Sequence, residues 1–148
     1  MHESMGTASF QMTANLTGHK GKVANLNWSP HFEDVLASTG DDGTIRVWNV
    51  QSKMCKVLVG HDDNTRAVAW NHEIPWILVS GSWDCSIRVW DIRTCSTIYI
   101  MNHHIADIYG IDSHPARPFI YTSCSRDTTI RQWALNGFIH SIKLRLVL

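Results

Sequence analysis

The stretch that decides the fold begins with Gly60-His61 and ends with Ser86-Ile87-Arg88-Val89-Trp90-Asp91. It decides the fold because the same pattern of residues occurs three times in the chain. In each copy a His stands 29 residues before a Trp, as His61 does before Trp90. Successive copies are spaced 42 and 43 residues apart. A repeat of this length indicates one supersecondary unit that is used three times.

A Ser and an Asp keep the same register within every copy. The recurring set is His19, Ser38, Asp42 and Trp48, then His61, Ser80, Asp84 and Trp90, then His104, Ser123, Asp127 and Trp133. With these residues, from about Thr17 to Gly137, the chain resembles the WD40 repeat family. The resemblance implies an all-β fold, a partial WD40-type β-propeller in which each copy is a four-stranded blade.

Short runs rich in Val, Ile, Thr and Trp, separated by turn residues, are typical of an all-β protein. They predict three blades of four strands and one leading strand at Phe10 to Thr17. The blade strands are predicted at 23–28, 35–39, 44–50, 54–59, 65–70, 76–81, 86–92, 96–101, 107–112, 118–123, 128–134 and 137–146. The predicted units are an N-terminal segment at 1–17 and WD repeats at 18–60, 61–102 and 103–148.

The third repeat is degenerate. Its departures are His103 for Gly, Ser113 for Trp, Gln132 for Val, and Ala134 for Asn or Asp. We expect the packing to differ most in this repeat.

Three blades are fewer than the roughly four to eight with which propellers usually close. Two sheet faces would lack partners, so the sequence predicts a part of a larger propeller, with Phe10 to Thr17 as the outer strand of an absent blade. Self-association of three-blade units is the alternative. It is less favoured because exposed strand edges lead readily to aggregation.

The composition is that of a soluble globular protein, with 44% hydrophobic and 18% charged residues. Lys plus Arg and Asp plus Glu both number 13, so no net field attracts nucleic acid or an anionic membrane. No apolar run approaches the roughly 18 residues of a membrane span, and we expect a cytoplasmic protein. The Cys residues form no C-x-x-C pair, and neither a metal site nor a cofactor is predicted.

Ser, His and Asp together also suggest a hydrolase, in which a carboxylate orients the base that activates a Ser. A catalytic site is built once, whereas this set occurs in every repeat, so we predict architecture and no enzyme. The family resemblance implies a hydrogen-bonded chain from Asp42 through His19 and Ser38 to the indole of Trp48. We call the four residues of each repeat a tetrad. The alternative is a propeller enzyme whose site lies in missing blades or central-channel loops.

Function is then expected where the repeats differ, on loops held by a rigid framework. In WD40 proteins the top face is formed by residues near the first strand of each blade and by the residue before the hairpin Asp. By register these positions are Lys22, Ala24, Asp41, Asn64, Arg66, Trp83, Asp107, Tyr109 and Arg126. Trp, Tyr and Arg are enriched in interface hot spots, so a face that binds proteins or peptides is predicted.

Two simpler interpretations apply to single residues of this face. Trp83 could pack on a neighbouring loop, and Arg126 could pair with Asp107 on a solvated rim, where such pairs contribute little. Nucleic acid binding would need a basic stripe, which the acidic residues interrupt.

Overall fold

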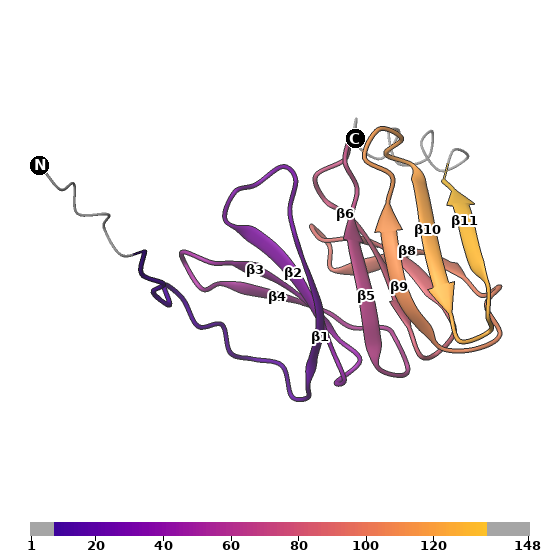
Figure 1. Ribbon diagram of the computed structural model, residues 1–148, viewed down its shortest axis with the longest axis horizontal. Coiled ribbons are helices and arrows are strands. Elements are labelled where there is room, and N and C mark those ends of the chain that lie inside the picture. The colour runs from indigo at the N-terminus through magenta and orange to yellow at the C-terminus, as the bar shows by residue number, and fades with distance from the viewer. Residues whose placement is uncertain (1–7, 136–148) are drawn as a thin grey trace, which may run out of the picture.

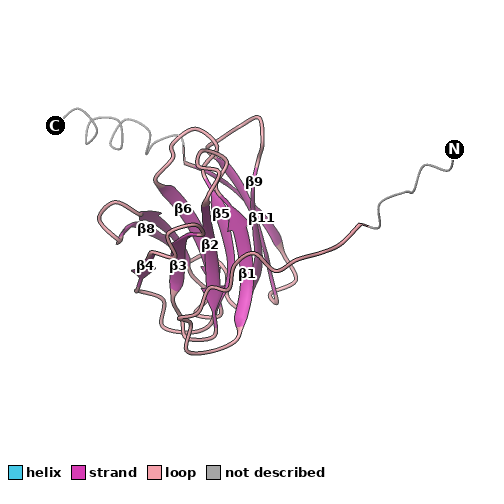
Figure 2. Cartoon of the chain, turned by 90° about the vertical axis from the view of Figure 1, so that its left-hand side faces the viewer, coloured by secondary structure: helices cyan, strands magenta, loops and turns pink. Residues whose placement is uncertain are grey.

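The computed structural model describes residues 8–135, which form eleven β-strands and no helix (Figure 1; Figure 2). The strands are β1 (Val23–Trp28), β2 (Val35–Gly40), β3 (Ile45–Asn49), β4 (Cys55–Leu58), β5 (Thr65–Trp70), β6 (Ile77–Ser82), β7 (Ile87–Asp91), β8 (Ser96–Met101), β9 (Ile108–Ser113), β10 (Ile120–Ser125) and β11 (Ile130–Ala134). This part of the chain therefore offers no helical segment that could cross a membrane.

The strands form three antiparallel sheets, and within each sheet they pair in chain order. We call these sheets blade 1 (β1–β4), blade 2 (β5–β8) and blade 3 (β9–β11). Their first strands are neighbours, with β1 next to β5 and β5 next to β9, so the sheets pack face against face (Figure 1). This is the arrangement of adjoining propeller blades.

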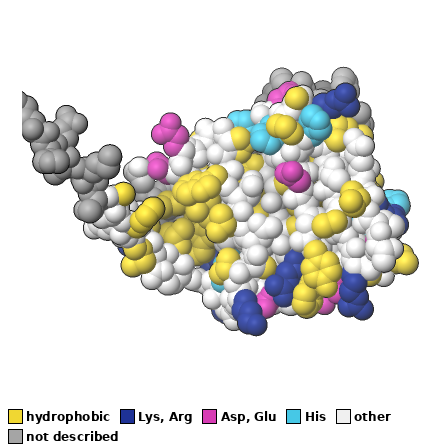
Figure 3. Space-filling model, in the orientation of Figure 1, with side chains coloured by type: hydrophobic (Ala, Val, Ile, Leu, Met, Phe, Trp, Pro, Cys, Tyr) yellow, Lys and Arg dark blue, Asp and Glu magenta, His cyan; other side chains and the backbone are white. Residues whose placement is uncertain are grey.

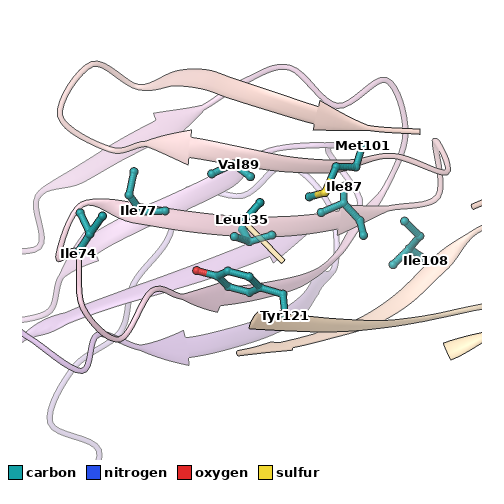
Figure 4. Close-up of a cluster of buried hydrophobic side chains, with 9 residues drawn as sticks. Ile74, Ile77, Ile87, Val89, Met101, Ile108, Tyr121 and Leu135 are labelled. Carbon is teal, nitrogen blue, oxygen red and sulfur yellow. The ribbon is translucent and has the colours of Figure 1, made fainter. Parts of the chain in front are cut away.

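The hydrophobic core lies between the sheets. Between blades 1 and 2 it contains Ala37, Ile45, Val47 and Leu58 on one side and Val68, Trp70, Leu78 and Trp90 on the other. Between blades 2 and 3 it includes Ile77, Val79, Ile87, Val89 and Met101 against Ile108, Tyr121 and Leu135 (Figure 4). Alternate residues of blade 2 enter the two clusters, which explains why its strands are apolar on both faces.

The prediction of an all-β partial propeller is confirmed. Eleven of the predicted blade strands are present, with ends within two residues of the expected positions. The twelfth, at 137–146, lies outside the described residues.

The predicted leading strand at Phe10 to Thr17 is wrong. These residues pair with none of the strands that the structure describes, and Phe10 is fully exposed. A strand is held by the hydrogen bonds of a neighbouring strand. Apolar and β-branched composition alone does not supply that neighbour.

Blade 1 is covered on one face only. Leu26 and Trp28 are 57% and 52% exposed, whereas their counterparts Val68 and Trp70, which face blade 1, are 3% and 1% exposed. Figure 3 shows hydrophobic side chains gathered on blade 1. The difference follows from position, because no described sheet precedes blade 1.

The outward face of blade 3 is more polar than the matching face of blade 2. Thr122 and Gln132 are exposed there, at the positions where blade 2 presents the buried Val79 and Val89 to blade 3. Ile130 on the same face is 77% exposed. The two end faces of the three-blade unit are therefore chemically unlike.

The turns between the second and third strands share one backbone conformation. Gly43 has φ 72°, and its counterparts Cys85 and Thr128 have φ 67° and 68°. A left-handed φ suits Gly but is strained for a residue with a Cβ, most of all a β-branched one. Blades 2 and 3 thus hold Cys85 and Thr128 in a backbone conformation that these residues do not favour by themselves.

Thr128→Gly is expected to raise the free energy of unfolding by about 1 kcal/mol, because relief of the strained φ exceeds the entropy that Gly adds to the unfolded chain. Urea unfolding would measure the change. Thr122→Gly, in the middle of β10, is the matched control and is expected to destabilise by about the same amount. Destabilisation by both substitutions would contradict the strain argument.

Candidate functional site

Each predicted tetrad forms one chain of hydrogen bonds. In blade 2, His61 Nδ1 lies 2.7 Å from Asp84 Oδ2, and His61 Nε2 lies 2.7 Å from Ser80 Oγ. Trp90 Nε1 donates to Ser80 Oγ at 2.8 Å. The same three distances are 3.1, 2.8 and 2.8 Å for His19, Asp42, Ser38 and Trp48, and 2.7, 2.7 and 2.8 Å for His104, Asp127, Ser123 and Trp133.

The tetrad ties four separate segments of a blade together. In blade 2, His61 precedes β5, Ser80 lies on β6, Asp84 lies in the β6–β7 turn and Trp90 lies on β7. Their side chains are polar groups that cost free energy when buried without partners. The tetrad supplies those partners within the blade.

The order of these bonds is that of a Ser-His-Asp catalytic triad. A carboxylate only accepts, so His61 Nδ1 donates to Asp84; with a neutral imidazole, Nε2 then accepts from the Ser80 hydroxyl. The tetrad differs from a catalytic triad in the accessibility of its Ser hydroxyl. Ser80 is fully buried, and its Oγ accepts a hydrogen bond from the Trp90 indole. A substrate carbonyl cannot reach this hydroxyl in the folded blade.

The Asp of each tetrad also organises its turn. Asp84 accepts from the backbone N–H of Asp62 and Ser86 and from the Ser86 hydroxyl. Burial alone would raise the pKa of Asp84, but hydrogen bonds from His61 and Ser86 outweigh it and hold this pKa well below its ordinary value.

The pKa values of the other two tetrad carboxyls are displaced in the same direction. Burial opposes the shift at Asp42, where hydrogen bonds from the backbone of Lys20 and from Thr44 lower the pKa. At Asp127 the hydrogen bond from Thr129 is the main cause of the lowered pKa. All three carboxyls are thus held in the charged form.

A lowered pKa makes stability depend on pH in a defined sense. The tetrad carboxylates stabilise the fold above their unfolded pKa of about 4, and this contribution is lost as the pH falls below it towards the folded pKa.

We expect Asp84→Asn to lower the free energy of unfolding at neutral pH by about 1–3 kcal/mol and to flatten the decline of this free energy below about pH 4. Urea unfolding across that range measures both effects, and an unchanged acid slope would contradict the assignment.

A second group of side chains connects the blades at the end of the molecule that carries the turns between the second and third strands of each blade. This end forms the lower edge in Figure 1. Arg66 Nη2 lies 2.8 Å from Asp41 Oδ1, in an orientation that makes an ion pair rather than a directed hydrogen bond. Arg66 Cζ lies 4.2 Å from the centre of the Trp83 ring, whose centroid is 6.1 Å from that of Tyr109 in an edge-to-face arrangement. We call Asp41, Arg66, Trp83 and Tyr109 the top-face ladder.

The ladder crosses all three blades. Asp41 comes from the β2–β3 turn, Arg66 from β5, Trp83 from the β6–β7 turn and Tyr109 from β9. Tyr109 is 47% exposed, and the side chain of Arg66 is 23% exposed. Packing on a neighbouring loop and exposure to solvent are therefore combined in one surface.

The remaining predicted top-face residues lie at the same end but have simpler surroundings. Arg126 Nη1 lies 3.0 Å from Asp107 Oδ2, and the Arg126 side chain is 69% exposed, which fits a solvated rim pair. Lys22 and Asn64 accept through their backbone carbonyls from the N–H groups of Asp41 and Trp83, both at 2.9 Å. Figure 3 shows basic and hydrophobic side chains side by side along this edge.

The chain matches a known family over most of its length. A model of the WD domain, G-beta repeat family fits residues 10–49, 52–91 and 95–134. The chain belongs to the WD40 family. Its three matched repeats end with β3, β7 and β11, the strands that carry the tetrad Trp.

Several WD40 repeat relatives are similar over short stretches. WD repeat-containing protein AAC3 of Dictyostelium discoideum is 42% identical over 43 residues, 29% of this chain and 9% of that protein. Protein transport protein SEC13 of Lodderomyces elongisporus is 36% identical over 52 residues, 34% of this chain and 17% of that protein. Ribosome biogenesis protein YTM1 of Candida albicans is 40% identical over 47 residues, 32% of this chain and 10% of that protein. The chain spans less than a fifth of each.

The degenerate third WD40 repeat keeps its tetrad although His103 replaces the Gly of the other two repeats. In the first two repeats a Cβ at Gly18 or Gly60 would lie 2.7 or 2.8 Å from an Arg guanidinium nitrogen, so a larger residue there requires the Arg side chain to move. In the third repeat Arg131 donates instead to Thr129, and the His103 ring lies 5.6 Å from that of Trp133. The third repeat thus places an aromatic ring beside its tetrad Trp at the position where the other repeats have Gly.

Sequence reasoning missed Asn71, a buried link between WD40 blades 2 and 3. Its Nδ2 donates to Pro118 O at 2.6 Å and to Tyr121 Oη at 2.8 Å, while its Oδ1 accepts from the backbone N–H of Glu73 and Ile74. Burial raises the pKa of Tyr121 to about 12. An Asn directly after a strand was the available signal, but it also fits an ordinary Asx turn.

No set of three His, Cys, Asp or Glu side chains within residues 8–135 is arranged to hold a metal ion.

Proposed function

We propose that this chain is a non-catalytic scaffold that binds a protein or peptide through the loops around the top-face ladder. The observation that supports this is the continuous contact from Asp41 through Arg66 and Trp83 to Tyr109. Trp, Tyr and Arg present large contact areas, and stacking fixes the guanidinium before a ligand arrives. Preorganisation of this kind reduces the entropy that binding would otherwise cost.

Burial of the tetrads supports the absence of catalysis. Ser38, Ser80 and Ser123 are at most 5% exposed, so the one recurring Ser-His-Asp set has no route to a substrate. The alternative of a propeller enzyme would place its site on central-channel loops or on loops of missing blades. Turnover of an ester or phosphate substrate by the purified chain would favour that alternative.

We further propose that the chain is part of a larger propeller, in which another blade covers Leu26 and Trp28. Support comes from the burial of the matching residues in blade 2 and from the small share of each relative that the chain spans. Head-to-tail self-association is less favourable, because Thr122 and Gln132 would meet the apolar face of blade 1. The repeat boundaries at 18–60, 61–102 and 103–148 belong to this proposal.

Three finer expectations from the sequence also stay proposals. Segments such as Ser80-Gly81-Ser82-Trp83-Asp84 resemble those of WD repeat-containing protein 17, a likeness that flanking sequence would test. The cytoplasmic location is testable by cell fractionation. The expectation that the partner is neither nucleic acid nor a membrane is testable by measuring binding of the chain to duplex DNA and to lipid vesicles.

The binding proposal predicts the effect of removing the ladder. Arg66→Ala combined with Trp83→Ala is expected to reduce capture of a partner protein from cell extract at least tenfold, because both hot-spot side chains are lost. A photo-crosslinking residue at Tyr109 should label the same captured protein, which mass spectrometry identifies.

Arg117→Ala is the matched control, since Arg117 is exposed at the opposite end of blade 3. It should leave capture unchanged, and both variants should keep the far-UV circular dichroism of the parent chain. Equal capture by the double variant and the parent would refute the top-face assignment.

A further inference from the structure

An apolar groove opens between blades 1 and 2, at the end of the molecule opposite the Asp42 turn. It has a volume of about 380 Å³, and its lining includes Phe32, Val35, Val47, Met54, Lys56 and Ile92. Val35 and Ile92 also pack against the core cluster between these blades. The groove is therefore an outward extension of the interblade core, built entirely from sheets that the structure describes.

The rim of the groove leaves large apolar side chains in solvent. Met54 is 73% exposed and Phe32 is 48% exposed. Adjacent exposed apolar side chains with a polar rim mark interaction sites, and the flexible thioether of Met adapts to different occupants. Because the groove is open along its rim, it suits a chain segment lying across the surface better than a small molecule enclosed by protein.

Lys56 gives the groove a charge. Its Nζ donates to Ile92 O at 3.1 Å, so the ammonium group bridges from blade 1 to blade 2. An ammonium has three donors, and two remain after this bond. None of the carboxylates in residues 8–135 forms an ion pair with it. The groove thus combines apolar surface with a positive charge that the described residues leave unneutralised.

We propose that this groove binds an acidic peptide segment of a partner protein, with a large apolar side chain in the cavity and a neighbouring carboxylate on Lys56. The partner's carboxylate supplies the negative charge that the groove lacks. Its apolar side chain covers Met54 and Phe32. This site is separate from the top-face ladder, so one blade pair offers two independent binding surfaces.

Fluorescence anisotropy with synthetic peptides tests the proposal. The probe is a fluorescein-labelled peptide Gly-Ser-Leu-Phe-Glu-Gly, and its partner has Lys in place of Glu. The 148-residue chain is expected to bind the Glu peptide about fivefold more tightly than the Lys peptide. Lys56→Glu should invert this preference, and Met54→Asp should weaken binding of the Glu peptide about tenfold.

Matched controls use exposed residues elsewhere in the chain. Met12→Asp and Arg117→Glu make the same changes of polarity and of charge away from the groove, and neither should alter the affinity of the Glu peptide by more than about twofold. Both groove residues are exposed, so thermal unfolding of all variants should match that of the parent.

Three results would overturn the proposal. The first is no binding of either peptide, or binding with no preference that Lys56→Glu inverts. The second is loss of peptide binding in the Arg66→Ala and Trp83→Ala double variant, which would place the peptide on the top face. The third is displacement of the peptide by oleate, together with unchanged peptide binding by every groove variant, which would indicate a lipid site.

Discussion

Trp70→Ala is expected to lower the free energy of unfolding by about 3–5 kcal/mol, the range for deleting a buried aromatic side chain. Trp70 is 1% exposed and packs in the cluster between blades 1 and 2. Its Nε1 also donates to Asn27 O of blade 1 at 3.0 Å, so the substitution removes an interblade hydrogen bond and leaves a cavity. A loss of this size is a large part of the total stability of a typical domain.

Trp28→Ala is the matched control, because Trp28 occupies the same register in blade 1 but is 52% exposed. It should cost about 1 kcal/mol or less. Thermal and urea unfolding of the two variants measures the difference, with Trp70→Ala expected to lower Tm by about 10 °C. Equal losses would mean that the face of blade 1 is covered in solution, and self-association measured by sedimentation would identify a second copy as its cover.

The sequence predicted the blades well because their information is local and repeated. Each Asp and Gly at a turn, and each alternating Ile, Val and Trp on a strand, defines a short segment that its own neighbours specify. The tetrads were also foreseeable, since residues at fixed register in three copies occupy equivalent places in each copy. Eleven strands and the grouping of each His, Ser, Asp and Trp follow from this repetition.

The ladder shows where register stops being sufficient. Arg66 and Trp83 were placed on one face by register, but the stacking between them and the ion pair to Asp41 depend on side-chain rotamers and on how two blades are tilted. Asn71 and the groove around Met54 likewise arise from contacts between blades. The prediction of a strand at Phe10 to Thr17 was wrong for a different reason, because a segment of strand-like composition had no described strand to pair with.

The second large effect is expected from Ser80→Ala, which should cost about 3 kcal/mol although it removes a single oxygen atom. Ser80 Oγ satisfies both Trp90 Nε1 and His61 Nε2, and all three residues are buried. Removing the hydroxyl leaves two buried polar atoms without partners, at about 1–3 kcal/mol for each such group. The free energy of unfolding from urea denaturation measures the loss.

Ser96→Ala supplies the control, since Ser96 is exposed on β8, and it should stay within about 0.5 kcal/mol of the parent. Ser80→Thr keeps the oxygen and should recover part of the loss, to the extent that the extra methyl group fits. A Ser80→Ala chain as stable as the parent would remove the architectural role. If that chain had also lost a hydrolytic activity shown by the parent, Ser80 would act as a nucleophile, and the likeness of the tetrad to a catalytic triad would reflect chemistry.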